Sequence, residues 1–127
     1  MRKAIIDKLK EISEFSDRVY QQFLAPSGTD TPYSVVAMGE ESPALGNMAG
    51  SHQHFEIYIY GSPSNFIDLD ELVIKVKQKL DKVLIETDDS PPRYFYPEFD
   101  RQLSDYKDDD RNLLMKTLYF FYAQARH

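Results

Sequence analysis

The chain has 127 residues, of which 42% are hydrophobic and 28% are charged, and its formal net charge is −6. This length and composition are typical of a soluble globular chain that folds as one domain over residues 1–127. The acidic balance argues against a protein that binds nucleic acid through its phosphates, because such binding needs a basic surface.

The chain contains no cysteine. This excludes disulfide bonds, thiolate metal sites and a thiol nucleophile. No apolar run approaches the roughly 20 residues that a membrane-spanning helix needs, so we expect no membrane partner. The first residues are charged and amphipathic rather than a basic segment followed by an apolar stretch, and we therefore expect no signal peptide.

The N-terminal part of the chain predicts a helix followed by a short strand. Apolar residues recur at helical spacing within Arg2–Phe15, and charged residues cover the other positions. Arg18–Leu24 is a candidate for a short strand. The next residues, Ala25–Pro32, are rich in Pro, Ser, Gly, Thr and Asp, which predicts a turn or loop.

The segment His54–Tyr60 is the clearest strand signal in the chain. Its residues alternate strictly between an aliphatic side (Phe55, Ile57 and Ile59) and an outward side (Glu56, Tyr58 and Tyr60). A period of two predicts a strand with one face in an aliphatic core. Tyr33–Met38, which is β-branched at its centre, predicts an earlier strand. Between them we expect Gly39–Gln53 to be a flexible hairpin loop, longer than the median connection and therefore a candidate for function.

Phe66–Glu86 has the clearest helical pattern in the chain. One apolar stripe runs along it, formed by Leu69, Leu72, Val73, Val76, Leu80, Val83 and Leu84. Three residues are candidates to cap its start, namely Ser64, Asn65 and Asp68, the last with Glu71 as a capping box.

The C-terminal part predicts two more strands separated by an acidic loop. Thr87–Pro92 ends the helix, and Arg93–Phe99 follows as a strand that Pro97 restricts to an edge or a bulge. Asp100–Asn112 is expected to be a solvated loop, and Leu113–Ala125 a long last strand that is apolar on both of its sides. These elements predict an α+β fold with long loops, in which two α-helices pack on one face of a mainly antiparallel sheet of four or five strands.

No motif in the sequence indicates catalysis or a cofactor. His52 and His54 are two residues apart and could form a metal pair, but a third ligand is not evident, and ordinary loop histidines are the favoured interpretation. Asp108-Asp109-Asp110 lacks the spacing and the central glycine of a calcium loop, so a solvated turn is favoured. Glu56 lies among aromatic residues, where an outward-facing strand glutamate is the better interpretation. We therefore expect no enzyme activity, no metal and no cofactor.

Aromatic residues are more abundant than the predicted core needs. With both helices on one face of the sheet, the other face would carry a set of Tyr and Phe side chains, and more aromatic surface than a small monomer usually exposes. Two interpretations stay open: a protein interface, or strand propensity with phenol groups facing water. The interface candidates are Tyr58, Tyr60, Tyr119, Phe121 and Tyr122.

The order of these elements, together with several short phrases, resembles a known family. A short N-terminal helix leads to a Val-Tyr strand and then to Ala-Pro-Ser-Gly-Thr-Asp-Thr-Pro-Tyr-Ser-Val-Val at Ala25–Val36. After a glycine-bearing loop come Phe-Glu-Ile-Tyr-Ile-Tyr at Phe55–Tyr60 and a helix with Val-Lys-Gln-Lys-Leu at Val76–Leu80. The chain is thus similar, over most of Met1–Val83, to the small tail-completion and tail-terminator proteins of long-tailed bacteriophages and prophages. The stretch Arg93–Asn112 departs from that pattern.

The resemblance implies a structural protein of the virion rather than an enzyme. Members of that family form a ring, usually six-fold, that caps the tail tube and joins it to the head connector. DNA passes through the channel without specific binding. The implied partners are further copies of the chain, the tail tube protein and the head-completion or connector protein. The implied location is the tail or neck of a virion assembled in the bacterial cytoplasm. The two predicted loops, Gly39–Gln53 and Asp100–Asn112, are candidates for docking onto neighbouring rings.

A different class of function stays open beside this one. The chain could be a small non-enzymatic α+β module that binds a protein partner, in a regulatory or toxin-neutralising role. A ring at micromolar concentration would favour the virion role.

Overall fold

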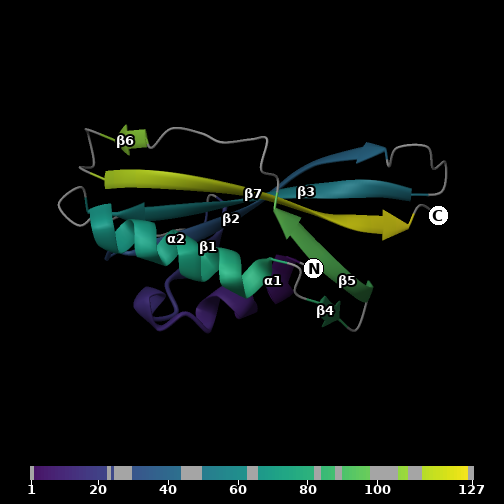
Figure 1. Cartoon of the computed structure of the whole chain (residues 1–127), viewed down its shortest axis with the longest axis horizontal. Coiled ribbons are helices and arrows are strands. Elements are labelled where there is room, and N and C mark those ends of the chain that lie inside the picture. Colours follow the sequence, from purple (N-terminus) through teal and green to yellow (C-terminus); the bar gives the residue numbers. More distant parts are fainter. Residues whose placement is uncertain are drawn as a thin grey trace.

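The computed structural model describes residues 2–22, 24, 30–43, 50–62, 66–81, 84–87, 90–97, 106–108 and 113–125. The elements follow in the order α1 (Arg2–Lys10), a 3-10 turn η1 (Ser13–Phe15), β1 (Val19–Gln21), β2 (Tyr33–Pro43), β3 (Gly50–Gly61), α2 (Phe66–Leu80), β4 (Leu84–Thr87), β5 (Ser90–Pro97), β6 (Tyr106–Asp108) and β7 (Leu113–Ala125). Both helices lie on the same side of the sheet (Figure 1). This arrangement confirms the predicted α+β class. No helix in the described ranges is long and apolar enough to cross a membrane.

The sheet is built around β3 and β7, which pair antiparallel along the whole length of β3. The strand order is β1-β2-β3-β7-β5-β4, and β6 pairs with β7 beside this path. Only β1 and β2 are parallel among the described pairs, which confirms a mainly antiparallel sheet. The described residues form seven strands rather than the predicted four or five.

The core lies between the sheet and the two helices. Phe55, Ile57 and Ile59 are fully buried there, which confirms the inward side predicted from their alternation. They pack in one cluster with the apolar stripes of α1 and α2, including Ile5, Leu9, Leu69, Leu72, Val76 and Leu80. Complete burial of one such side chain stabilises a fold by about 1.5–3 kcal/mol, so this layer holds the helices on the sheet.

The first helix is shorter than the sequence pattern predicted. α1 ends at Lys10, and a separate 3-10 turn, η1, follows at Ser13–Phe15. Ser16 and Asp17 then adopt left-handed backbone conformations, with φ of 47° and 65°. The break has a packing reason. In one continuous helix Phe15 would lie at the margin of the apolar stripe. The 3-10 turn instead places its ring in the core, where it is fully buried.

The second helix also ends before its predicted limit. α2 spans Phe66–Leu80, and the last three residues of the predicted helix, residues 84–86, instead belong to strand β4 (Leu84–Thr87), which pairs antiparallel with β5. Leu84 continues the helical spacing of the stripe, but in β4 its side chain is 49% exposed. Asp68 lies inside the first turn of α2 rather than at its cap, and the other two cap candidates, Ser64 and Asn65, lie outside the described residues.

The predicted hairpin loop Gly39–Gln53 is largely strand. β2 continues to Pro43 and β3 starts at Gly50, with an irregularity in their pairing between Met38 and Glu41. The side-chain amide of Gln53 donates to the carbonyl oxygens of Gly39 and His54 at 2.9 and 3.0 Å. These bonds satisfy backbone groups where the ladder is interrupted, and the pairing resumes at Glu41. The part of the predicted loop at residues 44–49 lies outside the described residues.

The C-terminal strands also differ from the prediction. β5 starts at Ser90, within the predicted break; its first part pairs with β4 and its last part, Phe95 to Pro97, pairs with β7. Pro97 is tolerated because it is the last residue of β5, where the strand pairs with β7 alone. β6 forms inside the predicted loop Asp100–Asn112 and pairs with the start of β7. The long last strand, Leu113–Ala125, is confirmed as β7.

Candidate assembly surface

The sheet has one face that neither helix covers (Figure 1), and we call it the helix-free face. Strand alternation and the pairing register define its members. β3 contributes His52, His54, Glu56, Tyr58 and Tyr60; β7 contributes Met115, Thr117, Tyr119 and Phe121; β2 contributes Tyr33, Val35 and Ala37; and β1 contributes Tyr20. The surface is therefore mainly aromatic and runs across four neighbouring strands.

The β1–β2 end of the helix-free face is already packed within one copy of the chain. The rings of Tyr33 and Tyr60 stack with centroids 4.7 Å apart, and the Tyr20 ring meets Tyr33 edge-on at 6.4 Å. On the same side of β2, Val35 and Ala37 are buried without any helix over them. Offset and edge-on aromatic pairs stabilise each other beyond the area they bury, so the tyrosines form a preorganised layer rather than isolated exposed rings.

A tyrosine–carboxylate contact lies at the centre of the helix-free face. The Tyr58 hydroxyl donates a hydrogen bond to the Glu56 carboxylate, two residues earlier on the same strand. Burial, followed by this hydrogen bond, raises the pKa of Tyr58. The phenol therefore stays neutral near pH 7 and acts as a fixed hydrogen-bond donor. Its partner Glu56 lies on the outward side of the strand, as the alternation predicted.

The two histidines of β3 lie on the helix-free face beside Phe121. The ring centroids of His52 and Phe121 are 4.8 Å apart, and those of His54 and Phe121 are 6.0 Å apart. The two imidazole rings lie edge-on to each other at 6.5 Å. Among the described residues no group of three His, Cys, Asp or Glu side chains is placed to hold a metal ion. Asp109 and Asp110 of the acidic turn lie outside the described residues.

Four of the five predicted interface candidates lie together. Tyr58, Tyr60, Tyr119 and Phe121 belong to the helix-free face, and all four are half-buried. The structure differs at the fifth candidate, because Tyr122 lies on the core side. Its side chain is 6% exposed, and its ring centroid is 5.6 Å from that of Phe95 and 6.1 Å from that of Phe55. Adjacent residues of a strand point to opposite faces, so Phe121 and Tyr122 cannot share one surface.

Two exposed isoleucines form a second apolar surface on the outer side of α2. The sequence analysis did not recognise this surface. Ile67 and Ile74 are 62% and 56% exposed. They are seven residues apart, or about two helical turns, and therefore share one side of the helix, opposite the buried stripe. The seven-residue spacing of Ile67 and Ile74 is visible in the sequence. The buried stripe of α2 contains more apolar residues, however, and the helical pattern was interpreted from that stripe alone.

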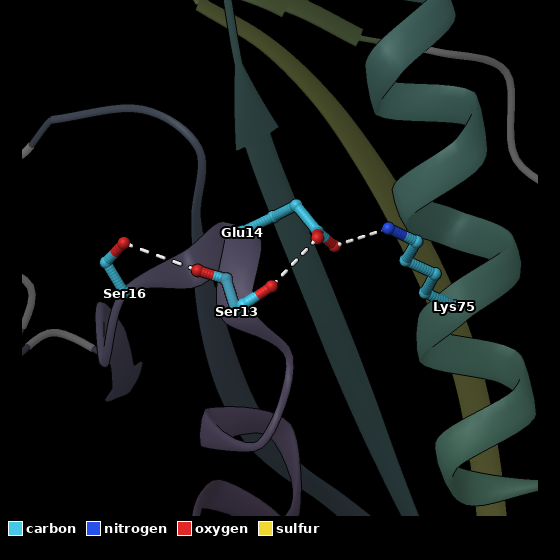
Figure 2. Close-up of polar contacts among 4 residues, drawn as sticks. All are labelled: Ser13, Glu14, Ser16 and Lys75. Atoms are coloured by element: carbon cyan, nitrogen blue, oxygen red, sulfur yellow. Dashed lines mark hydrogen bonds and ion pairs between the residues drawn. The ribbon is translucent and has the colours of Figure 1, made fainter.

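A cleft of about 280 Å³ lies among α2, η1, the residues just before β2 and the end of β3. At one wall the Lys75 ammonium lies 2.9 Å from a carboxylate oxygen of Glu14, and the Ser13 hydroxyl donates to the other oxygen at 3.1 Å (Figure 2). The hydrogen bond from Lys75 is the main reason that the pKa of Glu14 is lowered. Leu69 and Leu72 also line the cleft. The ion pair joins η1 to α2, so the arrangement is that of a structural contact.

Comparisons with known proteins identify the fold but no family. No protein-family model matches the chain, and no curated protein matches it. Among solved structures, a chain in the virion of a native gene transfer agent particle superimposes with a TM-score of 0.67. The match covers 98% of this chain and 94% of that chain, at 14% sequence identity. Likeness at this identity shows a shared fold over nearly the whole length of both chains.

Proposed function

We propose that this chain is a structural protein of a bacteriophage or prophage virion. One observation carries the proposal: its fold matches, almost end to end, that of a chain from a phage-like gene transfer agent virion. The helix-free aromatic face supports it, because a virion protein needs a large surface for contacts with other subunits. We further propose that the chain has no catalytic role, since its sequence contains no recognisable catalytic motif.

Within the virion, the proposed role is that of a tail terminator. Copies of the chain form a ring, with six as the expected number, that caps the tail tube and joins the tail to the head connector. A closed ring of identical subunits requires two different, complementary patches on each copy. Proposed partners are the tail tube protein and the head-completion or connector protein. The net charge of −6 suits a channel through which DNA passes without adhering.

The test combines the purified protein with the particle. Negative-stain microscopy at micromolar concentration is expected to show closed rings with a central channel. Antibodies against the chain are expected to label the neck of tailed particles released from the host, at the junction of tail and head. Labelling at another part of the particle would retain the virion role but contradict the terminator role. A protein that stays monomeric and is absent from particles would favour the rival role, a small protein-binding module.

A further inference from the structure

The structure carries a mainly aromatic face on one side of the sheet and two exposed isoleucines on the outer side of α2. We propose that the outer side of α2 in one copy, through Ile67 and Ile74, packs on the helix-free face of the next copy. The occupant of that face is thus a second copy of this chain. This inference rests on the ring proposed above and deepens it, because it names the two patches that the ring contact would join.

The outer side of α2 is unusual for a helix that packs on a sheet. Such a helix normally presents polar residues to water on the side away from the core. Here Ile67 and Ile74 are more than half exposed, while Leu69, Leu72 and Val76 bury the opposite side. The outer side therefore exposes two aliphatic side chains in addition to its polar residues.

The helix-free face supplies the complementary groups. Its half-buried rings, such as Tyr119 and Phe121, can pack against aliphatic side chains. In layered α+β folds, helices cover sheet faces. These rings are half-buried in one copy, so their exposed parts supply only a share of the roughly 800 Å² that each partner buries in a standard interface, and the neighbouring residues of both patches supply the rest.

The positions of the two patches determine the kind of contact. α2 lies on one side of the sheet and the helix-free face on the other (Figure 1), so the patches of one copy cannot meet each other. Contact between two copies then joins unlike patches and leaves one of each unoccupied. Such a head-to-tail contact is heterologous, and it generates a ring when the rotation between successive copies closes.

Mixed cross-linking tests this pairing, and the absence of native cysteines gives a clean background. One variant carries Ile74→Cys on α2, and the other carries Thr117→Cys, which is nearly isosteric, on the helix-free face. The two are mixed at assembly concentration and treated with a short bis-maleimide cross-linker, with a size tag on one variant. We expect several-fold more of the mixed product than of either self-linked product. The control replaces Ile74→Cys by Lys10→Cys, at an exposed position of α1, and is expected to give background only.

Each outcome bears on the interface separately from the proposed function. A mixed product no more abundant than in the Lys10→Cys control would overturn the pairing, as would a predominance of Ile74→Cys self-linkage, which indicates helix-to-helix contact. Microscopy of the same samples reports the ring independently. Rings without the mixed product leave the terminator role standing and reject this interface. The mixed product without closed rings supports the interface and counts against the ring.

Discussion

At the scale of single residues, the described core contains one polar side chain without a hydrogen-bond partner. Ser34 is fully buried on the inward side of β2, opposite Ile59 of β3. Its backbone N–H donates to the Arg18 carbonyl oxygen at 3.0 Å, whereas its hydroxyl has no partner within the described part of the chain. A buried hydroxyl without a partner costs free energy that an apolar group does not.

We therefore predict that Ser34→Ala stabilises the protein. The substitution removes an unsatisfied hydroxyl from the core, and the free energy of unfolding is expected to rise by about 1 kcal/mol. Urea denaturation measures the change. Val36→Ala is the matched control, because Val36 lies two residues further on the same side of β2 and is also fully buried. It is expected to lower the free energy of unfolding by about 2 kcal/mol through the loss of buried hydrocarbon. A loss of stability in Ser34→Ala would indicate that the hydroxyl has a partner after all.

The ion pair between Glu14 and Lys75 gives a prediction about pH. The hydrogen bond from Lys75 lowers the pKa of Glu14 below its ordinary value of 4.5. A lowered pKa in the folded state stabilises the fold above the unfolded pKa, and this contribution is lost as pH falls through the lowered pKa. Glu14→Gln should therefore reduce stability at pH 7 and have no effect in strong acid.

The expected effect of Glu14→Gln is at most about 1 kcal/mol, because both side chains are largely exposed. Thermal unfolding of the variant and the parent protein at pH 7 and pH 3 measures it, and the difference in Tm should shrink at the lower pH. Glu11→Gln is the control, since the Glu11 contacts to Lys8 and Lys79 are longer, at 3.6 and 3.9 Å. A difference that persists unchanged at pH 3 would assign the effect to packing rather than to charge.

At the scale of elements, the close approach of α2 to the end of β3 depends on Gly61. A Cβ atom at this position would lie 3.0 Å from Cδ1 of Leu69 and 3.4 Å from Cδ2. Leu69 belongs to the buried stripe of α2 and is 3% exposed, so its side chain has little room to move. The absence of a side chain at the last residue of β3 thus lets the first turns of α2 contact the sheet.

We predict that Gly61→Ala destabilises the protein by about 1–3 kcal/mol, the usual cost of adding a carbon atom to a packed core. The reason is specific to Leu69, and a double-mutant cycle measures it. In the background of Leu69→Ala, which removes the atoms in conflict, Gly61→Ala should cost clearly less. Equal costs in the two backgrounds would show that the glycine is needed for another reason.

At the scale of the whole molecule, the two faces of the sheet differ in what covers them (Figure 1). One face packs against both helices and forms the core, while the helix-free face carries a preorganised aromatic layer. A substitution on the helix-free face can therefore change association without disturbing the core.

Tyr58→Asp is expected to leave the fold intact and to abolish assembly. In a single copy this half-buried position still leaves the new carboxylate in contact with water, whereas an interface would remove that water, and an unpaired charge without water costs several kcal/mol. Circular dichroism reports the helix content, and sedimentation reports the size of the assembly. Lys10→Asp is the control, because it adds an acidic group at an exposed position of α1. Native helix content with an unchanged assembly in Tyr58→Asp would exclude this part of the helix-free face as an interface.

The sequence by itself determined those features that depend on neighbouring residues. The alternation in His54–Tyr60 predicted which residues are buried, and the structure confirms it for Phe55, Ile57 and Ile59. The existence of both helices, the long last strand and the grouping of Tyr58 with Tyr60 also followed from local periodicity. A period of two or of 3.6 residues is a property of one segment, so it can be recognised without knowledge of the segment's partners.

Only the tertiary structure decided where elements end and which side of an apolar strand faces the core. The apolar pattern of α2 continues to Leu84, but pairing with β5 makes Leu84–Thr87 a strand. β7 is apolar on both sides, and its register with β3 and β5 places Tyr122 in the core and Phe121 on the opposite face. β2 and β3 likewise continue to pair beyond Met38, where the glycine-containing sequence predicted a loop. In each case the observed structure is selected by contacts with residues distant in the chain. The periodicity of one segment carries no information about those contacts.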